Sequence, residues 1–366
     1  MKVALIHDHL AQDGGAEKVL LVLAEMYREA PIYTLLAEPD VAKKFSRRIE
    51  TSIIQRLPGG IKHYQWYMPF MPMAVEFFNL NGYDLVISDA SAFAKGVITG
   101  TDTLHICYCH TPTRYVWDYT HQYIDELPYN KYFKKVISLV LNYIRLWDRQ
   151  AADRVDFFIA NSKTVQKRIK KYYHRDSIVI YPPVEVNKYA VRNSSGEFFL
   201  IGGRLAKYKR VDIVVEAFRD LGLPLKVFGD GVDLDRLREI AGGAPHIQFL
   251  GRVSEEEKIK LFETCKAFLN PQEEDFGITV VEAMAAGRPV IAYGKGGATE
   301  TLEEGVSGVF FSEQTVASIK DAVARFNTLT FNQNVIRAKA EQYSVENFKL
   351  KMTEAVEEFK RKFYHN

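Results

Sequence analysis

The sequence EDFGITVVEAMAAG, residues 274–287, follows the apolar run Ala267–Asn270. The apolar run is typical of a buried strand, and the residues after Gly277 are typical of a helix over 279–286, so a loop feeds a helix directly. The backbone amides of Gly277 to Thr279 would lie at the amino terminus of that helix, where unpaired donors and the helix dipole favour a phosphate. This stretch therefore predicts an α/β unit with an anion site at a helix start.

Two acidic side chains accompany this helix start. Glu282 is expected in the first turn, where its carboxylate could reach sugar hydroxyls beside the phosphate. The alternative is that Glu274 and Glu282 only complement the helix dipole, as acidic residues near helix amino termini commonly do.

The same alternation of strands and helices runs through the chain and restarts after a Pro-Pro pair at 182–183. Alternating strands and helices favour parallel sheets covered on both faces, and prolines suit a hinge. The sequence predicts two α/β domains, 1–182 and 183–343, and a terminal helical segment, 344–366, that could cross back to the first domain. Strands are expected at 3–6, 85–88, 103–109, 157–160, 198–201, 225–228, 267–270 and 290–292, and helices at 16–29, 139–152, 211–219, 234–241, 279–286 and 345–363.

The composition of the 366 residues limits the partners. Lys and Arg number 48 and Asp and Glu number 46, which leaves no global positive field for nucleic acid. Cys107 and Cys109 lie between His105 and His110 on one expected strand. Because successive side chains on a strand point to opposite faces, His110 would point away from the face of the cysteines, so a zinc site is disfavoured and no metal is expected.

Nothing near the amino terminus predicts export, because the apolar run 3–6 is too short for a signal peptide. No stretch reaches the roughly 20 apolar residues that cross a bilayer. Together with three cysteines, this favours the cytoplasm.

A cationic loop, GGRLAKYKR at 202–210, follows the expected strand 198–201. Open α/β sheets bind ligands at the carboxyl ends of their strands, so Arg204 and Lys209 are expected at a ligand site. The alternative is a solvated run of surface charge.

These segments resemble one family. The Glu, seven residues, Glu pattern from Glu274 to Glu282, followed by GRPVIA at 287–292, GGATE at 296–300 and GVSG at 305–308, is similar in order and spacing to the retaining family 4 glycosyltransferases. The resemblance implies the GT-B fold, in which two Rossmann-like domains face a central cleft. It covers almost the whole second domain.

The resemblance also implies roles for individual residues. Glu282 would contact the ribose of the donor and Glu274 the transferred sugar, while Arg204 and Lys209 would hold the diphosphate. His110, in a segment similar to bacterial mannosyltransferases of polysaccharide assembly, would contact sugar. The other implied donor contacts are Gly14 and Gly15 in the first loop, Gly251, Arg252 and Val253 near the base, and Phe276, Gly277, Ile278 and Thr279 at the helix start.

The expected function is retaining transfer of a hexose, with mannose from GDP-mannose first and a UDP-hexose second. No cofactor is expected beside this co-substrate, and the acceptor would be a glycan or a polyprenyl-linked glycan. A non-catalytic sugar-nucleotide-binding protein is the alternative from another class. A dinucleotide dehydrogenase is disfavoured, because no Gly-x-Gly-x-x-Gly opens a helix after a strand.

The segment Tyr64–Phe78 is rich in aromatic and methionine side chains, and the segment Lys131–Arg149 combines basic residues with an apolar series. Such surfaces anchor proteins to anionic bilayers. Buried core and an oligomer contact are the alternatives. Localisation free in the cytoplasm and peripheral localisation on the inner face of the cell membrane both stay open.

Overall fold

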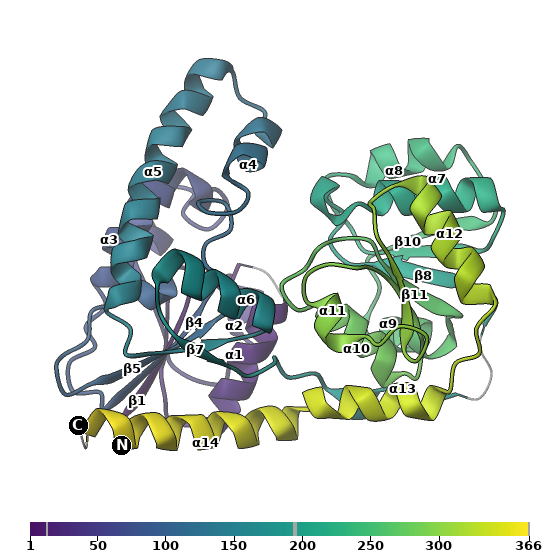
Figure 1. The fold of residues 1–366 in the computed structure, drawn as a ribbon. Helices are drawn as coiled ribbons and strands as arrows, with labels where there is room; N and C mark the ends of the chain where they lie inside the picture. The colour runs from purple at the N-terminus through teal and green to yellow at the C-terminus, as the bar shows by residue number, and fades with distance from the viewer. Residues whose placement is uncertain (12–13, 193–195, 365–366) are drawn as a thin grey trace. The chain divides into compact units, whose positions relative to one another are not determined.

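The computed structural model describes residues 1–11, 14–192 and 196–364. The chain forms two compact units (Figure 1). Unit 1 is residues 1–183 together with the segment from Phe348 onward, and unit 2 is Val184–Asn347. Each contains one parallel sheet with helices, so the prediction of two α/β domains is confirmed.

The sheet of unit 1 has seven strands in the order β3-β2-β1-β4-β5-β6-β7. Its central strands are rich in apolar residues, as expected for strands covered on both faces, and all six residues of Leu85–Ala90 are buried. The strands are β1 (Val3–His7), β2 (Ile32–Thr34), β3 (Ile49–Thr51), β4 (Leu85–Ala90), β5 (Leu104–Cys109), β6 (Phe157–Ala160) and β7 (Ser177–Val179).

Helices and shorter turns connect these strands. The α-helices are α1 (Gly15–Met26), α2 (Pro39–Ala42), α3 (Met71–Glu76), α4 (Thr120–Glu126), α5 (Lys131–Asp153) and α6 (Lys163–Arg168). The other helical turns are η1 (Ile53–Arg56), η2 (Tyr64–Phe70), η3 (Ala94–Gly96) and η4 (Ile169–Tyr173).

The helix α5 is longer than the sequence predicted, because it begins at Lys131 and not at 139. The side chain of Asn130 accepts hydrogen bonds from the amides of Tyr132 and Phe133 and caps this start. The early turns expose apolar side chains, so the periodicity of a buried face begins only at Leu141.

The last helix, α14 (Val345–Tyr364), starts in unit 2 and belongs to unit 1 from Phe348 onward. It runs along unit 1 (Figure 1). The ring of Phe359 stacks on Phe157 with centroids 4.3 Å apart, and Phe348 meets Tyr108 edge-on at 5.7 Å. The apolar periodicity of this segment therefore packs on the strands β5 and β6.

Unit 2 holds a six-stranded sheet in the order β10-β9-β8-β11-β12-β13. The strands are β8 (Phe199–Gly202), β9 (Leu225–Phe228), β10 (Ile247–Gly251), β11 (Ala267–Asn270), β12 (Val290–Tyr293) and β13 (Gly308–Phe311). The α-helices are α7 (Val211–Leu221), α8 (Leu234–Ala241), α9 (Glu255–Thr264), α10 (Ile278–Ala285), α11 (Ala298–Thr301), α12 (Val316–Asn327) and α13 (Gln333–Ala340). The 3-10 turns are η5 (Val186–Lys188), η6 (Lys207–Lys209) and η7 (Glu341–Tyr343).

The strand orders define one switch point in each sheet. In unit 1 the chain proceeds from β1 outward to β3 and then from β4 outward to β7, so β1 and β4 are the neighbours at the switch. In unit 2 the corresponding neighbours are β8 and β11. Open α/β sheets bind ligands outside the carboxyl ends of the strands at such a point.

Candidate functional site

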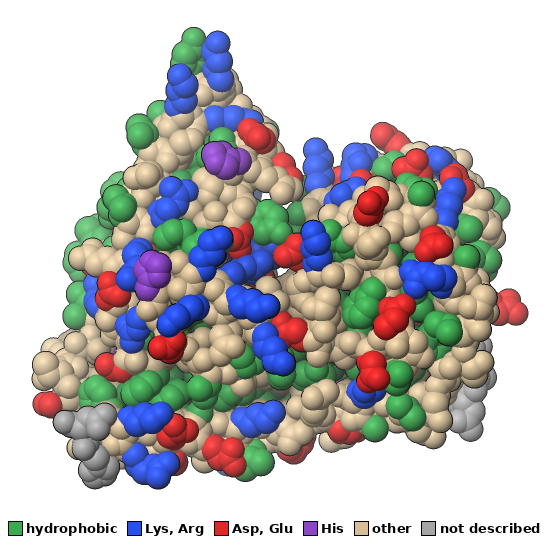
Figure 2. Space-filling model, viewed as in Figure 1, with side chains coloured by type: hydrophobic (Ala, Val, Ile, Leu, Met, Phe, Trp, Pro, Cys, Tyr) green, Lys and Arg blue, Asp and Glu red, His purple; other side chains and the backbone are tan. Residues whose placement is uncertain are grey.

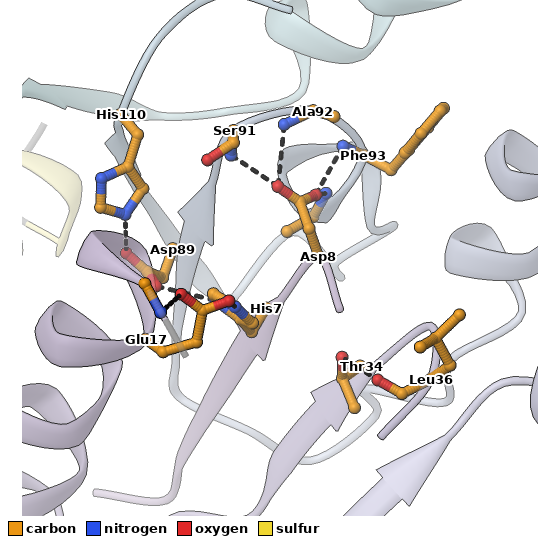
Figure 3. Close-up of polar contacts among 12 residues, drawn as sticks. His7, Asp8, Glu17, Thr34, Leu36, Asp89, Ser91, Ala92, Phe93 and His110 are labelled. Atoms are coloured by element: carbon orange, nitrogen blue, oxygen red, sulfur yellow. Dashed lines mark hydrogen bonds and ion pairs between the residues drawn. The ribbon is translucent and has the colours of Figure 1, made fainter. Parts of the chain in front are cut away.

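Four ionisable side chains of unit 1 meet near the ends of β1, β4 and β5 (Figure 3). The carboxylate of Asp89 lies 2.8 Å from Nδ1 of His7 through one oxygen and 2.6 Å from Nε2 of His110 through the other. Nε2 of His7 lies 3.8 Å from Oε1 of Glu17, and the second oxygen of Glu17 accepts the amide of Gly14 at 2.9 Å. A chain of contacts therefore joins His110 to the start of α1.

The opposite charges of His7 and Asp89 stabilise each other's ionised form. Burial alone would lower the pKa of His7, but its contacts with Asp89 and Glu17 and their negative charges raise that pKa to about 10. Burial alone would raise the pKa of Asp89, but the charge of His110 and the hydrogen bonds from both histidines lower it. At neutral pH, His7 is an imidazolium and Asp89 a carboxylate.

The neighbouring Asp8 fixes the loop after β4. Its two carboxylate oxygens accept four backbone amides, from residues 91 to 94, at 2.6–2.8 Å (Figure 3). A carboxylate with this many donors is fully satisfied and holds the loop to the end of β1. The role of Asp8 is structural.

We expect the unfolding free energy of unit 1 to decrease as the pH rises from 6.5 to 10. The folded-state pKa of His7 is about 10 and its ordinary value is 6.5, so its stabilising charge is fully present below pH 6.5 and is lost as the pH rises toward 10. All three tryptophans, Trp66, Trp117 and Trp147, lie in unit 1, so denaturant unfolding followed by tryptophan fluorescence reports on that unit. His7→Gln, measured alongside, should lose less stability over this interval. Equal slopes in both proteins would contradict the assignment.

Gly14 and Gly15 stand at the start of α1. Gly14 precedes the helix in extended conformation and Gly15 is its first residue. A Cβ at Gly14 would come within 3.0 Å of a carboxylate oxygen of Glu17, so the close approach of that side chain favours glycine. Asp13, which precedes the two glycines in the sequence, lies outside the described residues.

In unit 2, Lys209 and Glu274 form an ion pair at the switch point. Lys209 ends η6, in the loop after β8, and Glu274 lies in the loop after β11. Gln272 donates to the same oxygen of Glu274 at 3.2 Å. Two residues that are 65 positions apart in sequence thus meet where a ligand is expected.

The loop that carries Glu274 leads into α10. Gly277 precedes the helix with a φ of 87°, a left-handed conformation that favours glycine. Phe276 is buried and meets the ring of Tyr343 at 5.4 Å. The helix begins at Ile278, with Thr279 next, as the sequence predicted within one residue.

The prediction that Glu282 lies in the first turn is wrong, because α10 starts at Ile278 and places Glu282 in the second turn. Its carboxylate is buried and accepts a hydrogen bond from Nζ of Lys258 at 2.9 Å. The pKa of Tyr189 is raised, mainly by burial and next by the negative charge of Glu282. A buried and paired Glu282 does not act merely as a complement to the helix dipole.

The segment 251–253 follows β10. Gly251 ends this strand with a φ of 69°, and its carbonyl accepts the amide of Gly229, after β9, at 2.7 Å. Nε of Arg252 lies 3.2 Å from the carboxylate of Asp230. Val253 follows in the loop before α9.

The structure groups the predicted residues within each unit. It brings Lys209 to Glu274, while Arg204 is an exposed residue of the same loop as Lys209 and the segment 251–253 follows β10, farther along the sheet. In unit 1 it links His110 to Gly14. Among the residues that the structure describes, no group of three or more His, Cys, Asp and Glu side chains is suited to a metal ion.

Sequence reasoning missed three members of the unit 1 cluster, namely His7, Glu17 and Asp89. A signal was available for two of them, because His7 and Asp89 are polar residues at the ends of apolar strand runs. The pairing of β1 with β4, which sets His7 opposite Asp89, is a contact across 82 positions and is not visible in local pattern.

Two family models match the chain. Glycosyltransferase Family 4 matches residues 13–188, and Glycosyl transferases group 1 matches residues 185–343. The two matches follow one another and together span nearly the whole chain.

Several known proteins are similar to parts of the chain or to all of it. The chain spans about half the length of two matched glycosyltransferases of Methanocaldococcus jannaschii, 52% and 58%. An alpha-1,3/1,6-mannosyltransferase of Dictyostelium discoideum is 22% identical, with 90% of this chain and 89% of that protein covered. A GDP-mannose-dependent alpha-(1-6)-phosphatidylinositol monomannoside mannosyltransferase of Mycobacterium tuberculosis is 34% identical, with 33% and 36% covered.

The fold as a whole is similar to that of a solved protein, HepE of Anabaena in complex with UDP. The TM-score is 0.73, the identity is 18%, and the match covers 98% of this chain and 100% of that one. At this identity the likeness concerns the fold. Given its two sheets, its paired family matches and this likeness, the chain belongs to the family 4 glycosyltransferases with the GT-B fold.

Proposed function

We propose that the chain transfers mannose from GDP-mannose to a glycan or lipid-linked acceptor, with retention of anomeric configuration and without a metal ion. The observation that carries this proposal is the ion pair of Lys209 with Glu274 at the switch point of unit 2. A nucleotide sugar joins a phosphate directly to a hexose, so a cation and a carboxylate side by side suit that junction. The cation can stabilise charge on the departing diphosphate, and the carboxylate can accept hydrogen bonds from sugar hydroxyls.

The donor is proposed from the relatives. The mannosyltransferases of Dictyostelium and Mycobacterium favour mannose, and the second of them favours GDP-mannose by its name. The complex of HepE with UDP favours a UDP-sugar as the second candidate. A non-catalytic sugar-nucleotide-binding protein would bind a donor without turnover.

A donor screen in excess chelator tests the proposal. GDP-mannose should bind by calorimetry and be turned over or slowly hydrolysed, and UDP-glucose should bind more weakly. Glu282→Gln should weaken nucleotide binding, on the order of tenfold or more, because a carboxylate makes stronger hydrogen bonds to hydroxyls than an amide does. Binding without turnover favours the non-catalytic alternative, and a strict requirement for manganese or magnesium would refute the metal-free part.

We also propose that unit 1 binds an anionic membrane surface through α5. Five side chains at alternating spacings of four and three residues form one exposed stripe on this helix, with exposed fractions of 49–72%. Hydrophobic and basic side chains gather at the projecting end of the helix (Figure 2). The stripe consists of Tyr132, Val136, Leu139, Tyr143 and Leu146.

The charges beside the stripe favour lipid over a second copy of the chain. Lys131 and Lys135 are exposed, and no acidic residue occurs between Lys131 and Trp147. A second copy would set like charges together, whereas an anionic surface attracts each of them by about 1 kcal/mol. In the segment Tyr64–Phe78 only part of the apolar side chains are exposed. The large exposed ones are Trp66, Phe70, Met73 and Phe77.

We expect the protein to sediment with anionic vesicles more than with neutral ones. The Lys131→Glu, Lys135→Glu double variant should lose most of this preference, and Leu139→Ser should weaken binding that persists in high salt. The matched control is Lys167→Glu with Lys351→Glu, which changes the net charge equally at exposed sites on α6 and α14. Equal losses in both double variants, or no preference for anionic vesicles, would contradict the assignment to α5. In the described part of the chain, no helix combines the length and the apolar character that a membrane span requires.

A further inference from the structure

Asp89 joins two histidines that come from different strands (Figure 3). It is the next-to-last residue of the buried strand β4 and is 1% exposed, while His7 ends β1 and His110 follows β5. The amide of His110 continues the sheet by donating to the carbonyl of Ala90 at 2.9 Å. Backbone pairing thus places all three side chains with little freedom.

An ionised carboxylate only accepts hydrogen bonds, so both ring nitrogens that face Asp89 carry protons. Asp89 is ionised because the two histidines lower its pKa against the effect of burial. Nε2 of His110, 2.6 Å from Oδ1, is therefore protonated whether the ring is neutral or cationic. The other nitrogen, Nδ1, points away from Asp89 (Figure 3) and in the neutral ring is a hydrogen-bond acceptor.

The second oxygen of Asp89 is committed to His7. His7 lies between Asp89 at 2.8 Å and Glu17 at 3.8 Å, so its positive charge prevents two buried carboxylates from facing one another uncompensated. Glu17 in turn accepts the amide of Gly14 at the start of α1. One carboxylate oxygen of Asp89 therefore accepts a hydrogen bond from His7, and the other accepts one from His110.

We infer that Asp89 is a positioning residue that fixes the ring orientation and the tautomer of His110, so that Nδ1 is presented to a hydroxyl group of the bound sugar. This inference rests on the proposed function, in which His110 contacts sugar. Asp89 itself touches no substrate. Its contribution is to hold the proton on Nε2, so that in the neutral ring Nδ1 is the acceptor.

The informative substitution is Asp89→Asn, because an amide replaces one of the two acceptor oxygens by an NH2 group that only donates. The carbonyl oxygen of the new amide is expected to face His7, because Glu17 also favours the protonated form of His7, which donates a hydrogen bond. The amide NH2 then faces His110, whose Nε2 must accept, and the proton moves to Nδ1. The volume of the side chain is unchanged, so a purely structural role predicts little change in the chemistry of His110.

Nitrogen-15 NMR of the full-length protein without ligand measures this directly. The signals of His110, assigned by their loss in His110→Gln, should show the Nε2–H tautomer in the wild type and the Nδ1–H tautomer in Asp89→Asn. The matched control is Ser88→Ala. Ser88 lies on the same strand and contacts Nε2 of the buried His105 at 2.9 Å, so its loss should change the signals of His105 and leave those of His110 unchanged.

With a donor that the wild type turns over, Asp89→Asn should lower kcat by about 10²- to 10⁴-fold, as expected when a histidine is held in the wrong tautomer, with KM changed only a few-fold. An Nδ1–H tautomer in the wild type overturns the inference even if the variant does not fold. An unchanged tautomer in a folded Asp89→Asn overturns it as well. Failure of every donor to bind or react would sink the proposed function, and the tautomer measurement would still decide the role of Asp89.

Discussion

Lys209→Met is expected to lower kcat by about 10²- to 10³-fold, the usual cost of removing one preorganised group that stabilises charge in a transition state. Lys209 forms an ion pair with Glu274 where β8 and β11 end, and the proposed reaction builds negative charge on the departing diphosphate. Methionine keeps much of the length and volume of lysine and removes the charge. Steady-state kinetics with the preferred donor should show the loss mainly in kcat.

Lys207→Met is the matched control for this experiment. Lys207 belongs to the same turn, η6, and is exposed to solvent. Its loss should change kcat less than about twofold, as for a solvated surface charge. If both lysine variants lose the same activity, the effect belongs to the general charge of the loop and not to the pair with Glu274.

Asp148→Asn is expected to lower the unfolding free energy of unit 1 by about 3–5 kcal/mol, the range for breaking a buried ion pair from one side. One oxygen of Asp148 lies 2.5 Å from Nζ of the buried Lys95 and accepts Thr113 at 2.7 Å. The other accepts Trp117 and Tyr173, both at 2.8 Å. An amide can accept through only one of its two positions, so several donors lose their partner.

Denaturant unfolding followed by circular dichroism should show the shift in the transition of unit 1, which tryptophan fluorescence identifies because all three tryptophans lie in that unit. Asp153→Asn is the control on the same helix. Asp153 pairs with Arg149 at 2.6 Å on the surface, so its loss should cost less than about 1 kcal/mol. A loss of similar size in both variants would mean that the buried contacts of Asp148 do not stabilise the unit.

The sequence was sufficient for the features that local pattern controls. The strands Phe199–Gly202 and Ala267–Asn270 were predictable because each begins with three buried apolar residues, and α10 begins within a residue of its expected start. The two sheets, the loops at their carboxyl ends and the helix that carries Glu282 were all predictable in this way.

Features that depend on contacts between residues far apart in the sequence were not predictable. The short edge strands β2 and β3, three residues each, have too few residues for a pattern of their own. The meeting of His7 with Asp89, and of Lys95 with Asp148, depends on strand order and helix placement and not on spacing in the sequence. The prediction that Glu282 lies in the first turn was wrong because the helix starts one residue earlier than expected, which moves this side chain into the second turn.

The packing of α14 on unit 1 has a consequence for how the protein is made. Unit 2 is one continuous stretch of chain, whereas unit 1 contains its first 183 residues and the segment from Phe348 onward. During translation, Tyr108 and Phe157 emerge long before Phe348 and Phe359, the aromatic partners that cover them. Domains usually fold in the order of synthesis. Here unit 2 can complete its folding on the ribosome while unit 1 keeps apolar surface uncovered until Phe348 and Phe359 have emerged, so unit 1 is expected to complete its folding after unit 2.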